Sequence, residues 1–398
     1  MRWPTAPLRK IAPPVTAPCN FAPDDRVWQL SLDQIEGATG EIVDKRYAPA
    51  SEAGTSTFCF DTDNVLYSKL RPYLNKVALP DEPGVATTEL IPLRPNPSTL
   101  IPRFLAYYLR SPGFVNQASH HVAGAKMPRV VMDWFWDHEA PLPAPKEQSR
   151  IVEVLDEADR LRRLRRVADA KAARILPALF LKMFGSPATN PKMLRKESLG
   201  KLIKVKSGDF LPAKDMAANG AFPVYGGNGV NGFHDKYMFE ERKVVLGRVG
   251  VYCGAVHYSQ QKAWITDNAL YVSEKLEDID DSYLVAALEL ANLNQYAGRA
   301  GQPLISGSRI YPVEILVPPE TEQRMFAKTA GDLLELGRKC DEAGKHLEQL
   351  WYLLMQRAFS GQLSAKWREA HFKELLAEME VQARLLNLPM QSSLEINQ

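Results

Sequence analysis

A long segment of this chain occurs twice, once before the middle of the sequence and once in its last third. The stretch PLPAPKEQSRIVEVLDEADRL, which begins at Pro141, aligns with LVPPETEQRMFAKTAGDLLEL, which begins at Leu316. The alignment places the Glu-Gln pair at 147–148 on the Glu-Gln pair at 322–323. An internal repeat of this length restricts the fold to architectures in which one structural unit is built twice.

The repeated segment predicts one long helix in each copy. Because the offset between the copies is a whole number of heptads, both copies keep the same heptad register. With Ile151 and Phe326 at position a, eight of the ten a and d positions in each copy are apolar. Such patterning is typical of a coiled-coil seam, so we expect the two helices to pack on each other, with a kink at Pro177. The apolar seam positions are Ile151, Val154, Ala158, Leu161, Ala168, Ala172, Ile175 and Leu179 in the first copy, and Phe326, Leu333, Leu336, Cys340, Ala343, Leu347, Leu350 and Leu354 in the second.

The segments that precede the two helices also correspond, although with gaps. SKLRPYLNKV at 68–77 aligns with GRVGVYCGAV at 247–256. The offset of this alignment is slightly larger than that of the helices, which indicates insertions in loops. Short runs rich in Val, Tyr and Leu and broken by Gly, Pro and Asp predict strands, and one helix per domain is expected, at 101–109 and 281–296.

These patterns predict an α+β fold. It has two mixed α/β domains separated by two long antiparallel helices that form a coiled coil, with a pseudo-two-fold internal repeat. The expected parts are a first domain at 1–145, a first helix at 146–185, a second domain at 186–318, a second helix at 319–361 and a helical tail at 362–398. Nothing in the first half of the chain matches the tail.

Two unlike domains on such a helix pair suit a bipartite DNA target. A helix of about 30 residues spans roughly 45 Å. This is slightly more than the about 34–36 Å of one turn of B-DNA, the spacing that two-fold proteins use for half-sites. Because the two domains differ in sequence, the two half-sites are expected to differ as well.

Composition and charge exclude little by themselves. The net charge of +2 is too small to indicate a nucleic-acid partner, but residues 150–185 carry a net charge of +4. A solvated helix face is the alternative explanation for this local charge. The N-terminus has no apolar run of a signal peptide, and no run approaches the about 18 apolar residues of a membrane span, so a cytoplasmic protein is expected.

The four cysteines show no metal-binding pattern. Cys19, Cys59, Cys253 and Cys340 include no CxxC pair and have no histidine at ligand spacing. We therefore expect reduced, mostly buried thiols and no zinc site. His120 and His121 are expected to end a helix rather than to bind a metal.

Three motifs suggest chemistry but have more ordinary explanations. GNGVNG at 227–232 fits GxGxxG, yet no Rossmann strand or helix frames it, so we expect a glycine-rich turn or a loop close to DNA. Glu241 and Lys243 resemble half of a nuclease metal site, but a charged strand edge is expected. Trp134 and Trp136 alternate as strand residues do and are expected in the core. With no P-loop and no methyltransferase motif, no catalytic residue is expected.

The most specific part of the sequence runs from the EQ pair through RIVEVLDEAD to LFLKMFG, and its second copy runs from PPETEQ to QRAFSGQL. LYSKLRPYLNKV and FPVYGGNGVNGF add two stretches from the domains. On these motifs the chain resembles the specificity (S) subunits of type I restriction–modification enzymes. The resemblance covers about residues 8–363 and assigns no role to the tail.

This resemblance implies a non-catalytic subunit whose two target recognition domains each read one half of a bipartite DNA target. The long helices would set the gap between the half-sites and would dock two methyltransferase (M) subunits. Restriction (R) subunits are possible further partners. S-adenosylmethionine, ATP and Mg²⁺ are expected on these partner subunits, and no cofactor, metal or membrane is expected for this chain.

Candidate DNA-binding residues follow from the chemistry of duplex DNA. Phosphates attract Lys and Arg, while base edges pair with Arg, Asn and Gln. Surface solvation is the alternative explanation for each of them. The candidates are Lys69, Arg71, Lys126 and Arg129 in the first domain, Tyr225, Asn228, Asn231, Arg248, Arg299, Gln302 and Arg309 in the second, and Arg162, Arg163, Arg165 and Arg166, facing spacer phosphates or an acidic partner, on the first helix.

Two other functions are open from the sequence alone. A structural scaffold would use the helices to space two protein-binding domains, and it would bind duplex DNA weakly and without steep salt dependence. An enzyme with an unrecognised site is disfavoured because no catalytic constellation is present.

Overall fold

The computed structural model describes residues 3–217, 220–298 and 303–388 of the 398-residue chain. The chain divides into two compact units, of which unit 1 is Met1–Leu164 with Lys345–Gln398 and unit 2 is Arg165–Gly344. Each unit is mixed α/β, as expected from its sequence. Among the described residues, no helix is both long and apolar enough to cross a membrane.

The first long helix is interrupted rather than kinked. Helix α5 (Pro145–Ala172) ends before α6 (Ile175–Phe184) begins, whereas α10 (Glu320–Phe359) is continuous. Pro177 explains the break, because it has no N–H to donate to the carbonyl of Ala173 and its ring would clash with that carbonyl. Since Pro177 lies in the first turn of α6, its missing N–H is not needed there.

Unit 1 contains two main sheets of short strands. In the four-stranded sheet the order is β3-β2-β7-β4, and only the β2–β7 pair is parallel. In the three-stranded sheet β5 lies between β6 and β8, and small antiparallel pairs join β1 to β11 and β9 to β10. The strands are β1 (Thr5–Pro7), β2 (Arg26–Leu30), β3 (Tyr47–Pro49), β4 (Thr57–Phe60), β5 (Val65–Ser68), β6 (Val77–Ala78), β7 (Gly84–Thr87), β8 (Leu90–Leu93), β9 (Val122–Ala123), β10 (Arg129–Val130) and β11 (Glu139–Pro141).

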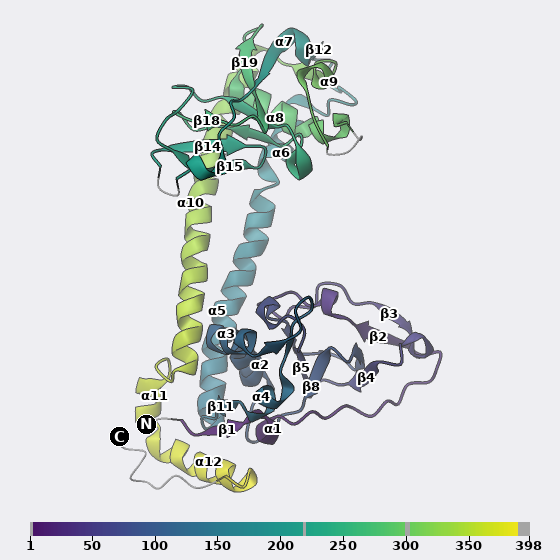
Figure 1. Cartoon of the computed structure of the whole chain (residues 1–398), viewed down its shortest axis with the longest axis vertical. Coiled ribbons are helices and arrows are strands. Elements are labelled where there is room, and N and C mark those ends of the chain that lie inside the picture. The colour runs from purple at the N-terminus through teal and green to yellow at the C-terminus, as the bar shows by residue number, and fades with distance from the viewer. Residues whose placement is uncertain (1–2, 218–219, 299–302, 389–398) are drawn as a thin grey trace. The chain divides into compact units, whose positions relative to one another are not determined.

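The main core of unit 1 lies where the domain meets the long helices. Helix α2 packs on β5 and β6 and also contacts α5 and the last turns of α10 (Figure 1). Ile151 and Leu155 of α5 and Met355 and Ala358 of α10 are buried in this core. The short helices of unit 1 are α1 (Leu8–Ile11), α2 (Pro102–Arg110), α3 (Pro112–His120) and α4 (Met132–Asp137).

The domain helices differ from the expected ones. A second helix, α3, directly follows α2, because Pro112 fits the first helical position and the Ser111 hydroxyl accepts a hydrogen bond from the N–H of Phe114 at 3.4 Å. In unit 2, the helix expected at 281–296 ends at Leu290, because Asn292 adopts a left-handed backbone conformation with φ of 47°.

Unit 2 also contains a small antiparallel pair of strands, of which β20 directly precedes the long helix α10, together with two larger sheets. Strand β12 pairs with β20 as β1 pairs with β11. The four-stranded sheet has the order β13-β19-β16-β17, and the three-stranded sheet has the order β15-β14-β18. The elements are β12 (Arg195–Ser198), α7 (Leu199–Leu202), β13 (Ile203–Ser207), β14 (Phe222–Gly226), β15 (Gly229–His234), β16 (Val244–Gly247), β17 (Val256–Tyr258), β18 (Trp264–Ile265), β19 (Ala269–Lys275), α8 (Asp281–Leu290), α9 (Gly307–Ile310) and β20 (Glu314–Val317).

An aromatic cluster forms the centre of the unit 2 core. Phe180 and Phe184 of α6 contact Tyr283 of α8 and Phe326 of α10, with ring centroids between 5.0 and 6.2 Å apart. The Tyr283 hydroxyl donates a hydrogen bond to the carbonyl of Leu316 at 2.7 Å, so the buried polar atom is satisfied.

The tail forms two helices in place of the single one expected. Helix α11 (Ala365–Ala370) is separated by His371 from α12 (Phe372–Leu385). Both belong to unit 1.

The expectation of four reduced cysteines is wrong. Cys19 and Cys59 form a disulfide bond, whereas Cys253 and Cys340 are free. The N–H of Ala17 donates to the carbonyl of Cys59 at 2.9 Å, which places the Cys19 segment beside β4. Sequence spacing did not reveal this pairing, because the two cysteines are 40 residues apart.

Candidate nucleic-acid interface

In unit 1, the four predicted basic residues lie on two adjoining segments. The segment after β5 contacts the β9–β10 hairpin, because the N–H of Val130 donates to the carbonyl of Lys69 at 2.9 Å. The N–H of Arg71 likewise donates to the carbonyl of Pro128 at 2.7 Å. We call the surface formed by Lys69, Arg71, Lys126 and Arg129 the unit 1 basic surface.

The side chains of the unit 1 basic surface differ in their availability. Lys126 is exposed. Arg71 adopts a left-handed backbone with φ of 48°, and its buried Nε has no hydrogen-bond partner among the described residues. Left-handed residues other than glycine are uncommon and cluster at functional sites, so the backbone of Arg71 marks this turn as a candidate site.

Arg129 is partly occupied by an acidic neighbour. Its Nη2 lies 2.7 Å from Oε1 of Glu89, and its Nε donates to both carboxylate oxygens at 3.1 Å. The hydrogen bond from Arg129, assisted by the charges of Arg129 and Lys69, holds the pKa of Glu89 below its usual value. A phosphate at this surface would therefore compete with Glu89 for Arg129.

Unit 2 repeats the same backbone arrangement. The N–H of Ile305 donates to the carbonyl of Arg248 at 2.9 Å, and the N–H of Gly250 donates to the carbonyl of Pro303 at 3.0 Å. The bond from Ile305 to Arg248 matches the bond from Val130 to Lys69. The bond from Gly250 to Pro303 matches the bond from Arg71 to Pro128. Gly250 also has a left-handed backbone, with φ of 75°, at the position of Arg71.

Arg248 is thus the counterpart of Lys69. Its Nη1 donates to the Ser207 hydroxyl and to the carbonyl of Asp267, both at 3.1 Å. The predicted residues Arg299 and Gln302 lie outside the described part of the chain.

The glycine-rich stretch at 227–232 lies in the β14–β15 hairpin, an arrangement that a dinucleotide-binding loop does not have. A Cβ atom placed on Gly227 would lie 3.4 Å from the Cα of Gly247, so the hairpin turn lies beside the strand end that leads to Arg248. Asn228 and Asn231 are exposed on this hairpin. We call Asn228, Asn231 and Arg248 the unit 2 polar surface.

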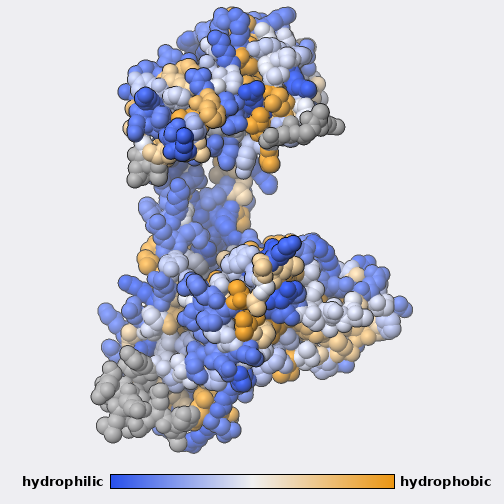
Figure 2. Space-filling model, in the orientation of Figure 1, coloured by the Kyte–Doolittle hydropathy of each residue, from blue (hydrophilic) through white to orange (hydrophobic). Residues whose placement is uncertain are grey.

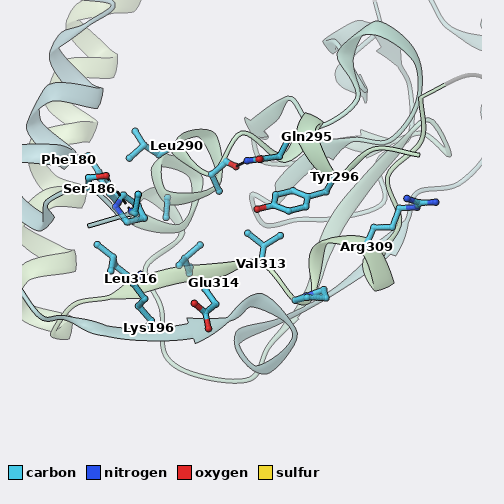
Figure 3. A pocket seen from close by; sticks show the side chains of 16 residues that line it. Phe180, Ser186, Lys196, Leu290, Gln295, Tyr296, Arg309, Val313, Glu314 and Leu316 are labelled. Atoms are coloured by element: carbon cyan, nitrogen blue, oxygen red, sulfur yellow. Dashed lines mark hydrogen bonds between the residues drawn. The ribbon is translucent and has the colours of Figure 1, made fainter. Parts of the chain in front are cut away.

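Two predicted residues of unit 2 lie elsewhere. Tyr225 is only 6% exposed, and its hydroxyl accepts a hydrogen bond from the N–H of Gln260 at 3.1 Å, so it belongs to the core and cannot reach DNA. Arg309 is exposed at the rim of a cavity of about 690 Å³, and Figure 3 shows its side chain directed away from the apolar lining around Leu290 and Val313. Its guanidinium lies against Gly298.

The residues that resembled a nuclease motif, and the second histidine of the His-His pair, contact other side chains of the protein. Lys243 lies 3.7 Å from Glu241, and Arg242 is stacked on Tyr258. The ring of His121, at the end of α3, stacks on Trp134 at 4.5 Å. Within the described residues, no group of three or more His, Cys, Asp or Glu side chains is placed to hold a metal ion.

The two tryptophans are core residues, but not on a strand. Trp134 and Trp136 lie in α4 and pack partly buried against the main core of unit 1. The spacing of two residues between the tryptophans therefore did not indicate a strand here, because both lie in a short helix.

The arginines of α5 pair with acids of this chain, which the sequence did not reveal. Arg162 is stacked on Trp351 at 4.5 Å and donates to Glu348 at 2.6 and 3.0 Å. Arg163 lies 2.9 Å from Glu41. Arg165 pairs with Asp169 and, in unit 2, donates to the carbonyl of Cys340. These contacts leave less charge for spacer phosphates than the sequence suggested.

The predicted seam is only partly buried. Ile151 and Phe326 are fully buried, yet Leu161, Leu336 and Leu350 are 47%, 58% and 62% exposed. The face of the long helices visible in Figure 2 is mostly hydrophilic. Half-buried positions are Val154, Ala158, Leu179, Leu333, Cys340, Leu347 and Leu354, and further exposed ones are Ala168, Ala172, Ile175 and Ala343.

Comparison with known proteins agrees with the repeated fold. A family model described as the type I restriction modification DNA specificity domain matches residues 51–168 and 192–335, which together make up more than half of the chain. The chain belongs to this family. The two matched segments correspond to the two copies of the internal repeat, so each copy carries one DNA specificity domain.

Two curated relatives in the family come from Escherichia coli. The EcoprrI specificity subunit of a type I restriction enzyme is 26% identical over 137 residues, which are 33% of this chain and 34% of that protein. The EcoDI specificity subunit is 24% identical over 181 residues, 42% of this chain and 40% of that protein. The chain thus spans between about a third and two fifths of the length of these relatives.

Solved structures share the fold over nearly their whole length. A chain from a study of complex assembly and conformational transition of the type I R-M system has a TM-score of 0.58 at 18% identity, covering 91% of this chain and 98% of that one. The S subunit of the type I restriction–modification system of M. genitalium has a TM-score of 0.55 at 16% identity, covering 90% and 96%. At these identities the similarity establishes the mixed α/β fold of the family.

Proposed function

We propose that this chain is a DNA-binding specificity subunit of a type I restriction–modification complex, with each unit reading one half of a bipartite target. The repeated backbone frame carries this proposal. The same hydrogen bonds position Lys69 and Arg71 in unit 1 and Arg248 and Gly250 in unit 2. One frame that presents different side chains suits recognition of two different half-sites.

The two long helices are proposed to act as an antiparallel coiled coil that sets the gap between half-sites. In unit 1, Arg162 of α5 contacts Glu348 of α10. In unit 2, Arg165, further along α5, contacts Cys340, which lies earlier on α10. From the first contact to the second, the residue number increases on α5 and decreases on α10. This supports an antiparallel, pseudo-two-fold arrangement.

Methyltransferase subunits are the proposed partners of the exposed apolar residues on these helices. A groove of about 420 Å³ in unit 1 is lined by Ala158, Leu347, Leu350, Trp351 and Leu354. Exposed apolar side chains around a groove are typical of a protein-binding surface. We infer that S-adenosylmethionine is bound by these partners, that ATP and Mg²⁺ are bound by restriction subunits where present, and that this chain itself is non-catalytic and acts in the cytoplasm.

Methylation mapping of genomic DNA tests the proposal directly. Cells that express this chain with its methyltransferase partner should methylate a single bipartite motif, and cells that lack this chain should not. Binding of the assembled complex to that motif should fall steeply with salt, because phosphate contacts release counterions. A scaffold would give unchanged methylation and weak, sequence-independent DNA binding.

A further inference from the structure

The starts of the two long helices share one hydrogen-bonded frame. The Gln148 carboxamide oxygen accepts the N–H of Ile101 at 2.8 Å, and its amide donates to the carbonyl of the proline five residues earlier at 2.7 Å. The Gln323 oxygen accepts the N–H of Asp280 at 3.0 Å, and its amide donates to the equivalent proline carbonyl at 2.8 Å. The starts of α5 and α10 are therefore structurally equivalent. The residues that pack over the start of α5 can be compared with those around the start of α10.

In unit 1, helix α12 covers this frame. The Gln382 amide donates to the carbonyls of Thr99 at 2.6 Å and Pro143 at 3.1 Å. Leu375 packs on Ala144, and both side chains are fully buried. The tail thus satisfies polar atoms and buries apolar surface at the start of α5.

The tail also matches the charges of the α5 start. Arg368 donates from Nε to Glu147 at 2.7 Å, and the Ser364 hydroxyl donates to the same carboxylate oxygen at 2.6 Å. The backbone N–H of Lys146 donates to Glu378 at 3.0 Å, which caps α5 from the tail. The Lys146 ammonium pairs with Glu374 and Glu378. Both charged residues of the first turn of α5, Lys146 and Glu147, therefore have an opposite charge on the tail.

In unit 2, no described residue covers the equivalent surface. Asp278 and Pro319, the counterparts of Thr99 and Ala144, are exposed, and Glu322, the counterpart of Glu147, is half-buried. Within the described part of the chain, the side chains of Asp278 and Glu322 have no hydrogen bond or ion pair. A cavity of about 470 Å³ lies beside Gln323, lined by Asp278, Pro319 and Met193 among others.

We propose that this unit 2 surface, formed by Asp278, Pro319, Glu322 and the cavity beside Gln323, binds a basic amphipathic helix of a partner protein in the place that α12 takes in unit 1. The charges favour a basic helix, because Asp278 and Glu322 are uncompensated among the described residues and Thr321 replaces Lys146. Arg195 and Glu320, which also line the cavity, are already paired with Glu277 and Arg324. Pro319 and Met193, which is 89% exposed, supply the apolar contact. This inference does not depend on how the chain reads DNA.

A peptide derived from the tail is the probe for this surface. The peptide comprises residues 364–388 with Glu374→Lys and Glu378→Lys, so that it suits the acidic unit 2 surface and is repelled by Lys146 in unit 1. Added to the full chain, it should bind saturably and protect amides at 278–281 and 320–323 from hydrogen exchange. The unaltered peptide should bind at least tenfold more weakly.

Variants of the chain locate the binding site. Glu322→Arg should weaken binding of the lysine-bearing peptide at least tenfold. Asp332→Arg is the matched control and should leave binding unchanged, because Asp332 is an exposed acid on the same helix, about 15 Å further along. Absence of saturable binding, protection confined to 99–101 and 143–148, or equal binding by Glu322→Arg would overturn the proposal.

Discussion

The carboxylate of Glu147 and the guanidinium of Arg368 form a buried ion pair, with 2.7 Å between Oε1 and Nε and side-chain exposures of 1% and 9%. The Trp3 indole N–H donates to the other oxygen of Glu147 at 3.0 Å. A residue near the N-terminus, the start of the first long helix and the tail therefore meet at one buried charge. The tail beyond the repeated part of the chain is an integral part of unit 1.

Removal of one partner from this pair should destabilise unit 1. Arg368→Met leaves the Glu147 carboxylate buried without its counter-charge, which costs about 3–5 kcal/mol in comparable pairs. Urea unfolding of the full chain, with hydrogen exchange of amides at 145–155 as the local readout, measures the loss. Arg384→Met is the control, since Arg384 is exposed and lies 3.9 Å from Glu380, and it should change stability by less than about 0.5 kcal/mol. Equal effects of the two variants would show that the buried pair contributes nothing special.

The ion pair between Glu89 and Arg129 should make the stability of unit 1 depend on pH. Because the folded chain holds the pKa of Glu89 below its usual value of 4.5, the pair stabilises unit 1 above that pH, and the stabilisation is lost as pH falls through the lowered pKa. Arg129→Gln should raise the pKa of Glu89, measured by NMR titration of its carboxyl carbon. Arg195→Gln, which removes the partner of Glu277 in unit 2, should leave the Glu89 titration unchanged; a shift there, or no shift in Arg129→Gln, would contradict the assignment.

Lys126 should contribute a phosphate contact rather than a base contact. In the chain assembled with the proposed methyltransferase partner, Lys126→Gln should weaken binding to all duplex sequences alike and should lower the slope of log affinity against log salt by about 1. Tyr225→Phe is the control, because Tyr225 is buried and should not affect the slope. A change in motif preference without a change in slope would place Lys126 at a base edge instead.

The helices should act as a ruler. Insertion of one heptad after Ala170 and one after Leu336 keeps the heptad register and lengthens each helix by about 10 Å. The preferred gap between half-sites should therefore grow by about 3 base pairs at roughly 3.4 Å each, while the half-site sequences stay the same. Methylation mapping provides the readout, and an unchanged gap would show that the helices do not set it.

Much of the repeated frame could be predicted from the sequence, because the two offsets between the copies, one for the helices and one for the domain segments, survive in the backbone. The alignment of 68–77 with 247–256 placed Lys69 on Arg248, and the same hydrogen bonds occur at these positions in both units. The repeated Glu-Gln pair was a visible signal as well, although its role in joining the long helix to the domain helix required the structure.

Other features depended on contacts between distant residues, which spacing does not report. Glu348 neutralises Arg162, and Glu89 engages Arg129 from 40 residues away. Tyr225 was predicted on a loop near DNA, but its strand carries it into the core. The apolar stripe predicted a closed seam, whereas Leu161 and Leu350 are exposed because one helix partner does not cover the whole stripe.

Exchange of a single recognition domain tests the central claim most directly. The first domain of this chain is replaced by that of another family member, with Thr99 and residues 139–145 retained because they support the tail and α5. Methylated motifs are then mapped in cells that express the hybrid with the proposed methyltransferase partner. Our account predicts that one half-site changes while the other half-site and the gap stay the same. A hybrid that methylates the original motif, or one in which both half-sites change, would contradict it.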